Sequence, residues 1–255
     1  MKLFLGIPSA GNPARPFAES LATLSLPPGV DGFERAVVTG NFVPAQRDVI
    51  AQRALDWGAD VLVMCDDDMV LASQTIVLLC DALDRQPDAG LAGALYYSRD
   101  GFRPMAVDRW DPHDTRTAII PAFDREPVTV DGVGFGCVAI RVRALQALMP
   151  PFFPAHVYVE RSAGRVRVCD EDYLFCARAR EAGWRVLLHP QARCGHYNRQ
   201  NDTIAPQTWE PPEKTRYPRM AVLEHGRHAL VPVRDVPGST SESHVAADVE
   251  YVIVP

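Results

Sequence analysis

Hydrophobic and polar residues alternate in blocks along the first 200 residues, and the blocks switch repeatedly between a strand-like and a helix-like period. Short apolar runs predict buried strands at residues 2–8, 33–39, 60–65, 90–97, 137–141 and 184–189. Apolar residues spaced three or four positions apart predict helices over 16–25, 41–58, 73–83 and 170–182. This order is typical of an α/β fold, so we expect a mostly parallel central sheet flanked by helices.

Two segments lack this regularity. Residues 98–127 are irregular and contain prolines, which predicts a long surface excursion of the kind that lines binding sites. After residue 198 the chain becomes polar and proline-rich, with weak strand signals at 220–223, 229–233 and 249–254. We therefore expect a core domain over 1–200 and a C-terminal extension over 201–255 that covers the core, forms a lid or mediates self-association into a homo-oligomer.

Composition and charge narrow the class of protein. The chain has 255 residues, of which 47% are hydrophobic and 23% charged, as in ordinary globular proteins. Its net charge of −6 argues against a nucleic-acid partner, because such binding needs clustered Lys and Arg. The six cysteines form no C-x-x-C pair, which favours reduced thiols. No apolar stretch approaches the roughly 18 residues of a transmembrane segment, so we expect a cytoplasmic protein.

Three consecutive carboxylates, Asp66 to Asp68, follow the strand predicted at 60–65. Like charges at this spacing raise one another's pKa unless a cation neutralises them, and open α/β sheets bind ligands at the carboxyl ends of their strands. Carboxylate oxygens suit Mg²⁺ or Mn²⁺, so the run predicts a metal site. Strand alternation would put Asp66 and Asp68 on one side and Asp67 on the other. The alternative is a solvated acidic loop that caps the next helix.

A second acidic group, Asp170 to Asp172, opens the helix predicted at 170–182. The helix dipole stabilises carboxylates in the first turn, which is a purely structural explanation. The functional explanation is a general base that projects into the site. His196 lies further along the chain; a lone histidine is more often a packing residue, but beside two aspartates it completes a metal site with room for a diphosphate.

Gly132, Gly134 and Gly136 precede the strand predicted at 137–141. They do not follow the first strand and do not open a helix, so they are not a dinucleotide-binding fingerprint. Glycines at this spacing allow the backbone to approach either a ligand or the neighbouring chain closely.

Taken in order, these motifs resemble glycosyltransferases of the GT-A fold, similar to family 2 and its relatives. The resemblance spans about residues 1 to 200 and depends on the order of the pieces. The pieces are Ile7-Pro8, Ala45–Ile50, Val63–Met69, Val133–Val138, Asp170–Phe175, Arg178–Trp184 and Gly195-His196. The family implies transfer of a sugar from a nucleotide-diphosphate donor to a hydroxyl acceptor, with Mn²⁺ or Mg²⁺ bridging the diphosphate.

The resemblance also implies roles for individual residues. Asp68 would bind the metal directly, together with His196, and Asp66 would contact the metal's water shell or the donor ribose. Asp172, from the pair Glu171-Asp172, would face the acceptor as the base of an inverting transfer. The residues implied for the donor pocket are Pro8, Ser9, Ala10, Arg47, Asp66, Asp67, Gly134 and Gly136.

Two positions depart from the family's pattern. Asp170 stands where the family usually has a small residue, and Thr39-Gly40-Asn41 replaces the acidic residue that often holds the nucleotide base. The resemblance therefore implies a UDP- or GDP-linked donor without deciding between them, and it leaves the acceptor open.

Two other functions fit part of these observations. A sugar nucleotidyltransferase shares the sheet and the acidic ligands, but the loop over 8–13 lacks the lysine that such enzymes normally carry. A non-catalytic module that binds a nucleotide sugar would keep the fold without a base. The presence of Asp66, Asp68, Asp172 and His196 favours catalysis.

Overall fold

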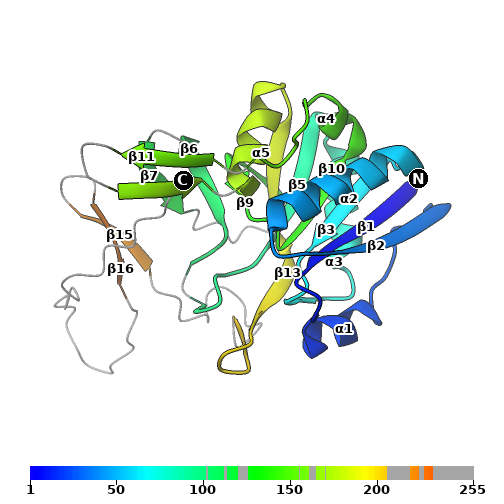
Figure 1. The fold of residues 1–255 in the computed structure, drawn as a ribbon, viewed down its shortest axis with the longest axis horizontal. Coiled ribbons are helices and arrows are strands. Elements are labelled where there is room, and N and C mark those ends of the chain that lie inside the picture. The colour runs from blue at the N-terminus through cyan, green and yellow to red at the C-terminus, as the bar shows by residue number, and fades with distance from the viewer. Residues whose placement is uncertain are drawn as a thin grey trace.

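One large sheet organises the chain, as the computed structural model in Figure 1 shows. The structure describes residues 1–101, 103–111, 114–119, 126–154, 156–160, 165–169, 171–205, 219–223 and 227–231. The main path of the sheet consists, in spatial order, of β14 (Thr203–Ala205), β13 (Arg185–Asn198), β5 (Ala89–Leu95), β10 (Cys137–Arg141), β3 (Val61–Cys65), β1 (Lys2–Ser9) and β2 (Gly32–Thr39).

The strands of this path run mostly in one direction. The pairs β1–β2, β1–β3 and β5–β13 are parallel, and β10 is antiparallel to both of its neighbours, β3 and β5. All residues of β3 and β5 are buried, because these inner strands are covered on both faces. The predicted mostly parallel sheet is confirmed. Because β3 lies between β10 and β1, its carboxyl end is at the centre of the carboxyl edge of the sheet.

Helices cover both faces of the sheet (Figure 1). One face carries α2 (Val43–Trp57), α4 (Val142–Gln146) and α5 (Glu171–Glu181), and the other carries α1 (Arg15–Leu21) and α3 (Thr75–Arg85). Gly58 ends α2 in the left-handed conformation, with φ of 72°. The helices predicted from apolar spacing are therefore present, and α2 and α5 share the face on which Arg47 and Asp172 lie.

Short strands complete the structure. β4 (Met69–Leu71) and β8 (Val128–Val130) pair with β13, and β6 (Ala106–Asp111), β7 (Asp114–Ile119) and β9 (Gly132–Val133) form a three-stranded sheet. Two hairpins join β11 (His156–Glu160) to β12 (Arg165–Cys169) and β15 (Arg219–Leu223) to β16 (Arg227–Val231). The segment 98–127, expected to be irregular, thus contains the pair β6–β7; the register shifts within that pair account for its weak periodicity.

β13 and β14 form a hairpin in which His196 lies opposite Ala205. Residues 203–205 therefore continue the main sheet past residue 200, where the core domain was predicted to end. The strand signal at 249–254 lies outside the described residues.

The structure also describes the cysteines and the helices, which concern the predictions of reduced thiols and of no transmembrane segment. Five cysteines, Cys65, Cys80, Cys137, Cys176 and Cys194, are free and buried, as expected for reduced thiols. Within the described ranges, every helix is too short or too polar to cross a membrane.

Candidate active site

The acidic run leaves β3 in a tight turn at the carboxyl edge of the sheet. The Asp66 N–H donates to the Gly136 carbonyl at 3.0 Å, and the Met69 N–H donates to the Asp66 carbonyl at 3.2 Å. Because residues 67 and 68 form a turn, strand alternation does not govern where the side chains point. Each carboxylate faces a different partner: Asp66 faces Arg47, Asp67 faces Ser9, and Asp68 faces Arg99 and His196.

Arg47 lies at the centre of a buried charge cluster. Its side chain is 3% exposed and comes from the first half of α2. Its guanidinium lies 2.9 Å from Asp66 and also pairs with Glu171 and Asp172 at the start of α5. The ring of Phe135 lies 5.4 Å from the guanidinium carbon. One buried cation therefore holds three carboxylates from two distant parts of the chain.

The cluster is buried and has more carboxylates than cations, and burial is the larger cause of its shifted pKa values. Burial raises the pKa of both Asp66 and Asp172 to about 6, although Arg47 opposes the rise. Burial alone would lower the pKa of Arg47, but the surrounding carboxylates outweigh burial and raise it. Arg47 therefore stays charged, and Asp66 and Asp172 titrate closer to neutral pH than ordinary aspartates.

Asp172 is held at both of its oxygens. Oδ1 accepts from Arg47, and Oδ2 accepts the Phe135 N–H at 2.9 Å. Its position in the first turn of α5 adds the favourable end of the helix dipole. The carboxylate is thus fixed in orientation beside the turn that carries Asp66.

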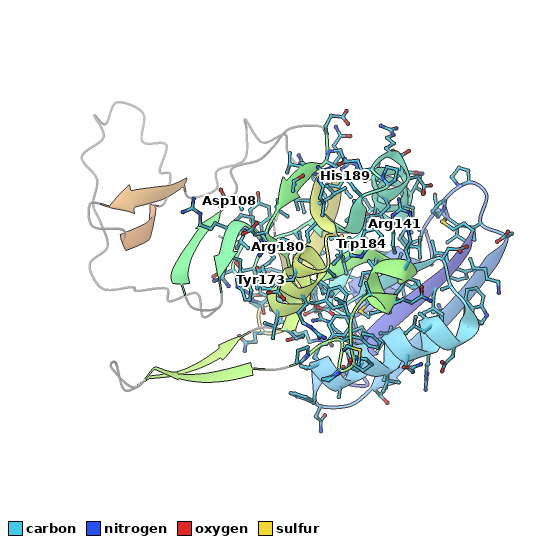
Figure 2. All side chains as sticks on the ribbon, turned by 90° about the horizontal axis from the view of Figure 1, so that it is seen from above. Asp108, Arg141, Tyr173, Arg180, Trp184 and His189 are labelled. Carbon is cyan, nitrogen blue, oxygen red and sulfur yellow. The ribbon has the colours of Figure 1, made fainter. Side chains whose placement is uncertain are left out.

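α5 is anchored on its other side to the three-stranded sheet. Figure 2 shows Tyr173 and Arg180 on the side of α5 that faces β6. Arg180 Nη1 lies 3.0 Å from Asp131 Oδ1, and Asp131 Oδ2 accepts the Trp110 N–H at 2.9 Å. These contacts fix the helix that presents Asp172.

His196 faces Asp68 across a short gap. Its Nε2 lies 3.4 Å from Asp68 Oδ2, and its Nδ1 lies 2.8 Å from the Tyr97 carbonyl. A carbonyl oxygen only accepts, so Nδ1 carries a proton; Nε2 donates to the carboxylate when the ring is doubly protonated and offers a lone pair to a bound cation when the ring is neutral. Burial would raise the pKa of Asp68, but the contacts with His196 and Arg99 outweigh burial and hold it below its usual value.

The predicted metal ligands are only partly brought together. Asp68 and His196 are adjacent, whereas Asp66 is engaged by Arg47. In the part of the chain that the structure describes, no group of three His, Cys, Asp or Glu side chains is arranged to hold a metal ion. The lone pair of His196 and the carboxylate of Asp68 fit a cation whose other ligands come from a substrate and from water.

The loop after β1 contacts the acidic turn. The Ser9 hydroxyl donates to Asp67 at 2.6 Å, and the Ala14 N–H donates to the Asp67 carbonyl at 2.8 Å. The Gln46 amide donates to the Ser9 carbonyl at 2.8 Å, which connects this loop to α2. Pro8 lies within β1, and Ala10 is exposed in the bend that follows. Ser9 lies beside the acidic turn, where the resemblance implies a donor pocket.

The glycine segment packs closely against Tyr96. A Cβ on Gly134 would lie 2.2 Å from the Tyr96 hydroxyl oxygen, and one on Gly136 would lie 2.7 Å from Tyr96 Cζ. The Gly136 N–H also donates to that hydroxyl at 3.0 Å. A Cβ on Gly132 would lie 2.6 Å from the Tyr173 ring. The close approach predicted for these glycines is therefore made to aromatic side chains of the same chain.

Several residues at the site were not found from the sequence. Arg99 and Arg199 come from segments without a recognisable motif, yet Arg99 contacts Asp68 and Arg199 lies 3.5 Å from Asp67. Their positions were the available signal, because Arg99 follows β5 and Arg199 follows β13, two parallel neighbours whose carboxyl ends lie at the same edge of the sheet.

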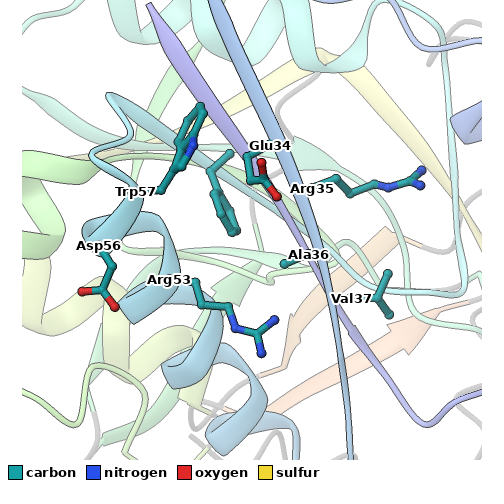
Figure 3. Close-up of a pocket in the computed structure, with 8 residues that line it drawn as sticks. Glu34, Arg35, Ala36, Val37, Arg53, Asp56 and Trp57 are labelled. Carbon is teal, nitrogen blue, oxygen red and sulfur yellow. The ribbon is translucent and has the colours of Figure 1, made fainter.

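A separate shallow pocket of about 550 Å³ lies between β2 and α2 (Figure 3). It is lined by Phe4, Glu34, Arg35, Ala36, Val37, Arg53, Asp56 and Trp57. Its lining includes none of the acidic residues of the turn after β3 and none of those on α5, so we do not assign the chemistry to it.

Known proteins resemble this chain in sequence profile and in fold. The family described as glycosyltransferase like family 2 matches residues 20–228. The structure is similar to A197 from STIV, with 15% identity and a TM-score of 0.54, covering 95% of this chain and 100% of that chain. It is also similar to GalNAc-T7 with UDP, GalNAc and Mn²⁺, with 12% identity and a TM-score of 0.53, covering 81% of this chain and 44% of that chain. No curated protein matches the chain significantly.

Proposed function

We propose that this chain, which belongs to the glycosyltransferase like family 2, moves a sugar from a nucleoside-diphosphate donor to an acceptor hydroxyl. One observation carries the proposal: the Asp68–His196 pair and the Arg47–Asp172 cluster meet at the carboxyl edge of the sheet. The Asp68–His196 pair is suited to a divalent cation that binds a diphosphate. The Arg47–Asp172 cluster offers a carboxylate as the base for the acceptor hydroxyl. The similar GalNAc-T7 structure contains UDP and Mn²⁺, which supports a UDP-linked donor.

The donor would bind over the acidic turn. Asp68 and His196 would hold Mn²⁺ or Mg²⁺, which when bound offsets the charge that develops on the departing diphosphate. Asp66 and Asp67 would orient the ribose and the metal-bound water, and Pro8, Ser9 and Ala10 would border the nucleotide base. Gly134 and Gly136 contribute indirectly, because they let Tyr96 support the turn.

Asp172 would accept the proton of the acceptor hydroxyl in an inverting displacement. Arg47 and the Phe135 N–H fix the carboxylate, and Glu171 shares the same cation. Burial raises the pKa of Asp172 to about 6, which brings the base nearer to neutrality than an ordinary aspartate. Because only the ionised form accepts a proton, we expect the transfer rate to fall as the pH drops below about 6.

Two substitutions test the proposal. Asp68→Ala should abolish metal-dependent binding of UDP or GDP in calorimetric titrations with Mn²⁺, because it removes the carboxylate that faces His196. Asp172→Asn should keep nucleotide binding but lower donor-dependent transfer by about 10²- to 10⁴-fold, the usual contribution of a general base. Transfer is measured with labelled UDP- and GDP-sugars against a panel of hydroxyl acceptors.

Asp81→Asn is the matched control, because Asp81 lies on α3 and pairs with the exposed Arg85. It should leave both binding and transfer unchanged. Nucleotide binding that ignores both Mn²⁺ and Asp68→Ala would contradict a metal-dependent transfer, and full transfer by Asp172→Asn would remove Asp172 as the base.

A further inference from the structure

Arg99 occupies the oxygen of Asp68 that faces His196. Its Nη2 lies 2.6 Å and its Nε lies 3.2 Å from Asp68 Oδ2. The same oxygen lies 3.4 Å from His196 Nε2. A cation shared by Asp68 and His196 needs this oxygen, so Arg99 and such a cation compete for one position.

The two partners of this contact differ in their freedom to move. The side chain of Asp68 is 8% exposed, whereas that of Arg99 is 61% exposed. Water solvates the guanidinium of Arg99 almost as well once it leaves, so the cost of separation falls on the buried Asp68, and a divalent cation bound in its place would offset that cost. Asp68 is therefore a fixed ligand and Arg99 a replaceable one.

The backbone around Arg99 is held in a defined turn. The Ser98 N–H donates to the Arg103 carbonyl, and the Gly101 N–H donates to the Ser98 carbonyl, both at 2.7 Å. Gly101 has φ of 79°, which favours glycine at this position. Since the turn is closed by its own hydrogen bonds, Arg99 can leave Asp68 by rotating its side chain while the backbone stays in place.

We propose that Arg99 is an exchangeable cation of the donor site, which neutralises Asp68 before the donor arrives and then moves onto the donor's diphosphate. This inference rests on the proposed function, because it takes the ligand to be a diphosphate with a divalent cation. A guanidinium matches two phosphate oxygens with two parallel N–H donors, so the released side chain has a stronger acceptor close by. Binding of the metal would thus release Arg99 for the diphosphate, and binding of the diphosphate to Arg99 would free Asp68 for the metal.

The exchange predicts that one variant, Arg99→Ala, binds Mn²⁺ more tightly and the nucleotide more weakly. Arg99→Ala should bind Mn²⁺ alone about two- to five-fold more tightly, since it removes the competing cation of a partly exposed ion pair. The same variant should bind UDP or GDP in the presence of saturating Mn²⁺ less tightly, since it lacks the diphosphate contact. Arg99→Lys keeps the charge without the two-pronged geometry, so it should resemble the unsubstituted chain with Mn²⁺ alone and lose nucleotide affinity.

The experiment measures free Mn²⁺ by electron paramagnetic resonance and nucleotide binding by calorimetry, on the full chain. Arg103→Ala is the control, because Arg103 closes the same turn through its backbone carbonyl and carries the same charge. Circular dichroism compares the folded content of all variants. An Arg99→Ala protein whose Mn²⁺ affinity equals that of Arg103→Ala, or whose nucleotide affinity does not fall, overturns the proposal.

The two arms distinguish failure of this inference from failure of the proposed function. If no nucleotide binds the unsubstituted chain at any Mn²⁺ concentration, the proposed donor is wrong. The Mn²⁺ measurement still shows whether Arg99 competes with the cation for Asp68. If Arg99→Ala does not bind Mn²⁺ more tightly, the exchange is rejected as well.

Discussion

Arg47 is the residue on which the electrostatics of the site depend. It pairs with three carboxylates, and among the described residues its own Nε is buried without a hydrogen-bond partner. The resemblance implied that Arg47 orders the donor pocket. The structure places it against Asp66, Glu171 and Asp172, so its direct contacts are with the acidic groups, and its role in ordering the donor pocket stays a prediction.

Arg47→Met tests this role through stability. Removing one partner of a buried ion pair leaves uncompensated charge, which typically lowers the free energy of unfolding by about 3–5 kcal/mol. Urea denaturation at pH 7.5 measures the loss, and the same change at Arg53, an exposed position of α2, should have little effect. An equally stable Arg47→Met protein would show that the cluster tolerates its charge without the guanidinium.

The loss in Arg47→Met should shrink in acid. The pKa of Asp66 and Asp172 is about 6 in the folded chain, above the ordinary value of 3.8, and removing Arg47 can only raise it. Below about pH 6 the unsubstituted chain gains the same stabilisation, so the deficit changes at higher pH, where the raised pKa lets the folded variant bind protons that the folded unsubstituted chain does not yet bind. Lowering the pH from 7.5 through about 6 therefore stabilises the variant more than the unsubstituted chain. Denaturation at pH 5 should show a smaller deficit than at pH 7.5.

At the scale of elements, the segment before β10 is shaped by Tyr96, which follows β5. The ring of Tyr96 lies against Gly134 and Gly136 and stacks edge-on with His196, their centroids 5.7 Å apart. The hydroxyl accepts the Gly136 N–H, and the Gly136 carbonyl accepts the Asp66 N–H. Gly136 thus connects Tyr96, at the end of β5, to the acidic turn through two hydrogen bonds.

A double-mutant cycle tests this contact. Gly134→Ala should lower the free energy of unfolding by about 1–3 kcal/mol, because its Cβ would clash with the Tyr96 hydroxyl oxygen. Adding Tyr96→Phe removes that oxygen, so the pair should be less destabilised than the sum of the single changes. Gly32→Ala is the control, since its Cβ would lie no closer than 3.2 Å to its neighbours, Lys2 Cγ and the Trp57 ring. Strict additivity in thermal denaturation would contradict the contact.

At the scale of the whole molecule, the hairpin β13–β14 places His196. His196 pairs with Met69 of β4 on one side and with Ala205 of β14 on the other. The predicted boundary at residue 200 would cut this hairpin, so the structural unit that supports the site continues to Ala205.

Truncation tests where the unit ends. A chain of residues 1–205 should keep the cooperative unfolding transition and the Mn²⁺ affinity of the full chain. A chain of residues 1–198 lacks β14, so it should unfold at a lower temperature and bind Mn²⁺ more weakly through the less constrained His196. Circular dichroism and Mn²⁺ titration check both, and equal behaviour of the two chains would show that β14 does not support the site.

Parts of the site were predictable from the sequence for a local reason. Residues 66–68 directly follow the buried strand β3, and Glu171 and Asp172 lie in the first turn of α5. Both positions could be predicted because the hydrophobic periodicity of the adjoining strand and helix marks where each ends or begins. The adjacency of Asp68 and His196 agrees with the resemblance. The pairing of Arg47 with Glu171 was not predicted, because the two residues are 124 positions apart.

The sequence by itself determined the order of the six main strands and of the helices α1, α2, α3 and α5, because burial leaves a periodic record in neighbouring residues. Only the tertiary structure decided which charge faces which. A single Arg serves three carboxylates, and a second Arg holds the aspartate nearest His196, since ion pairs form between side chains that folding brings together from segments far apart in the chain.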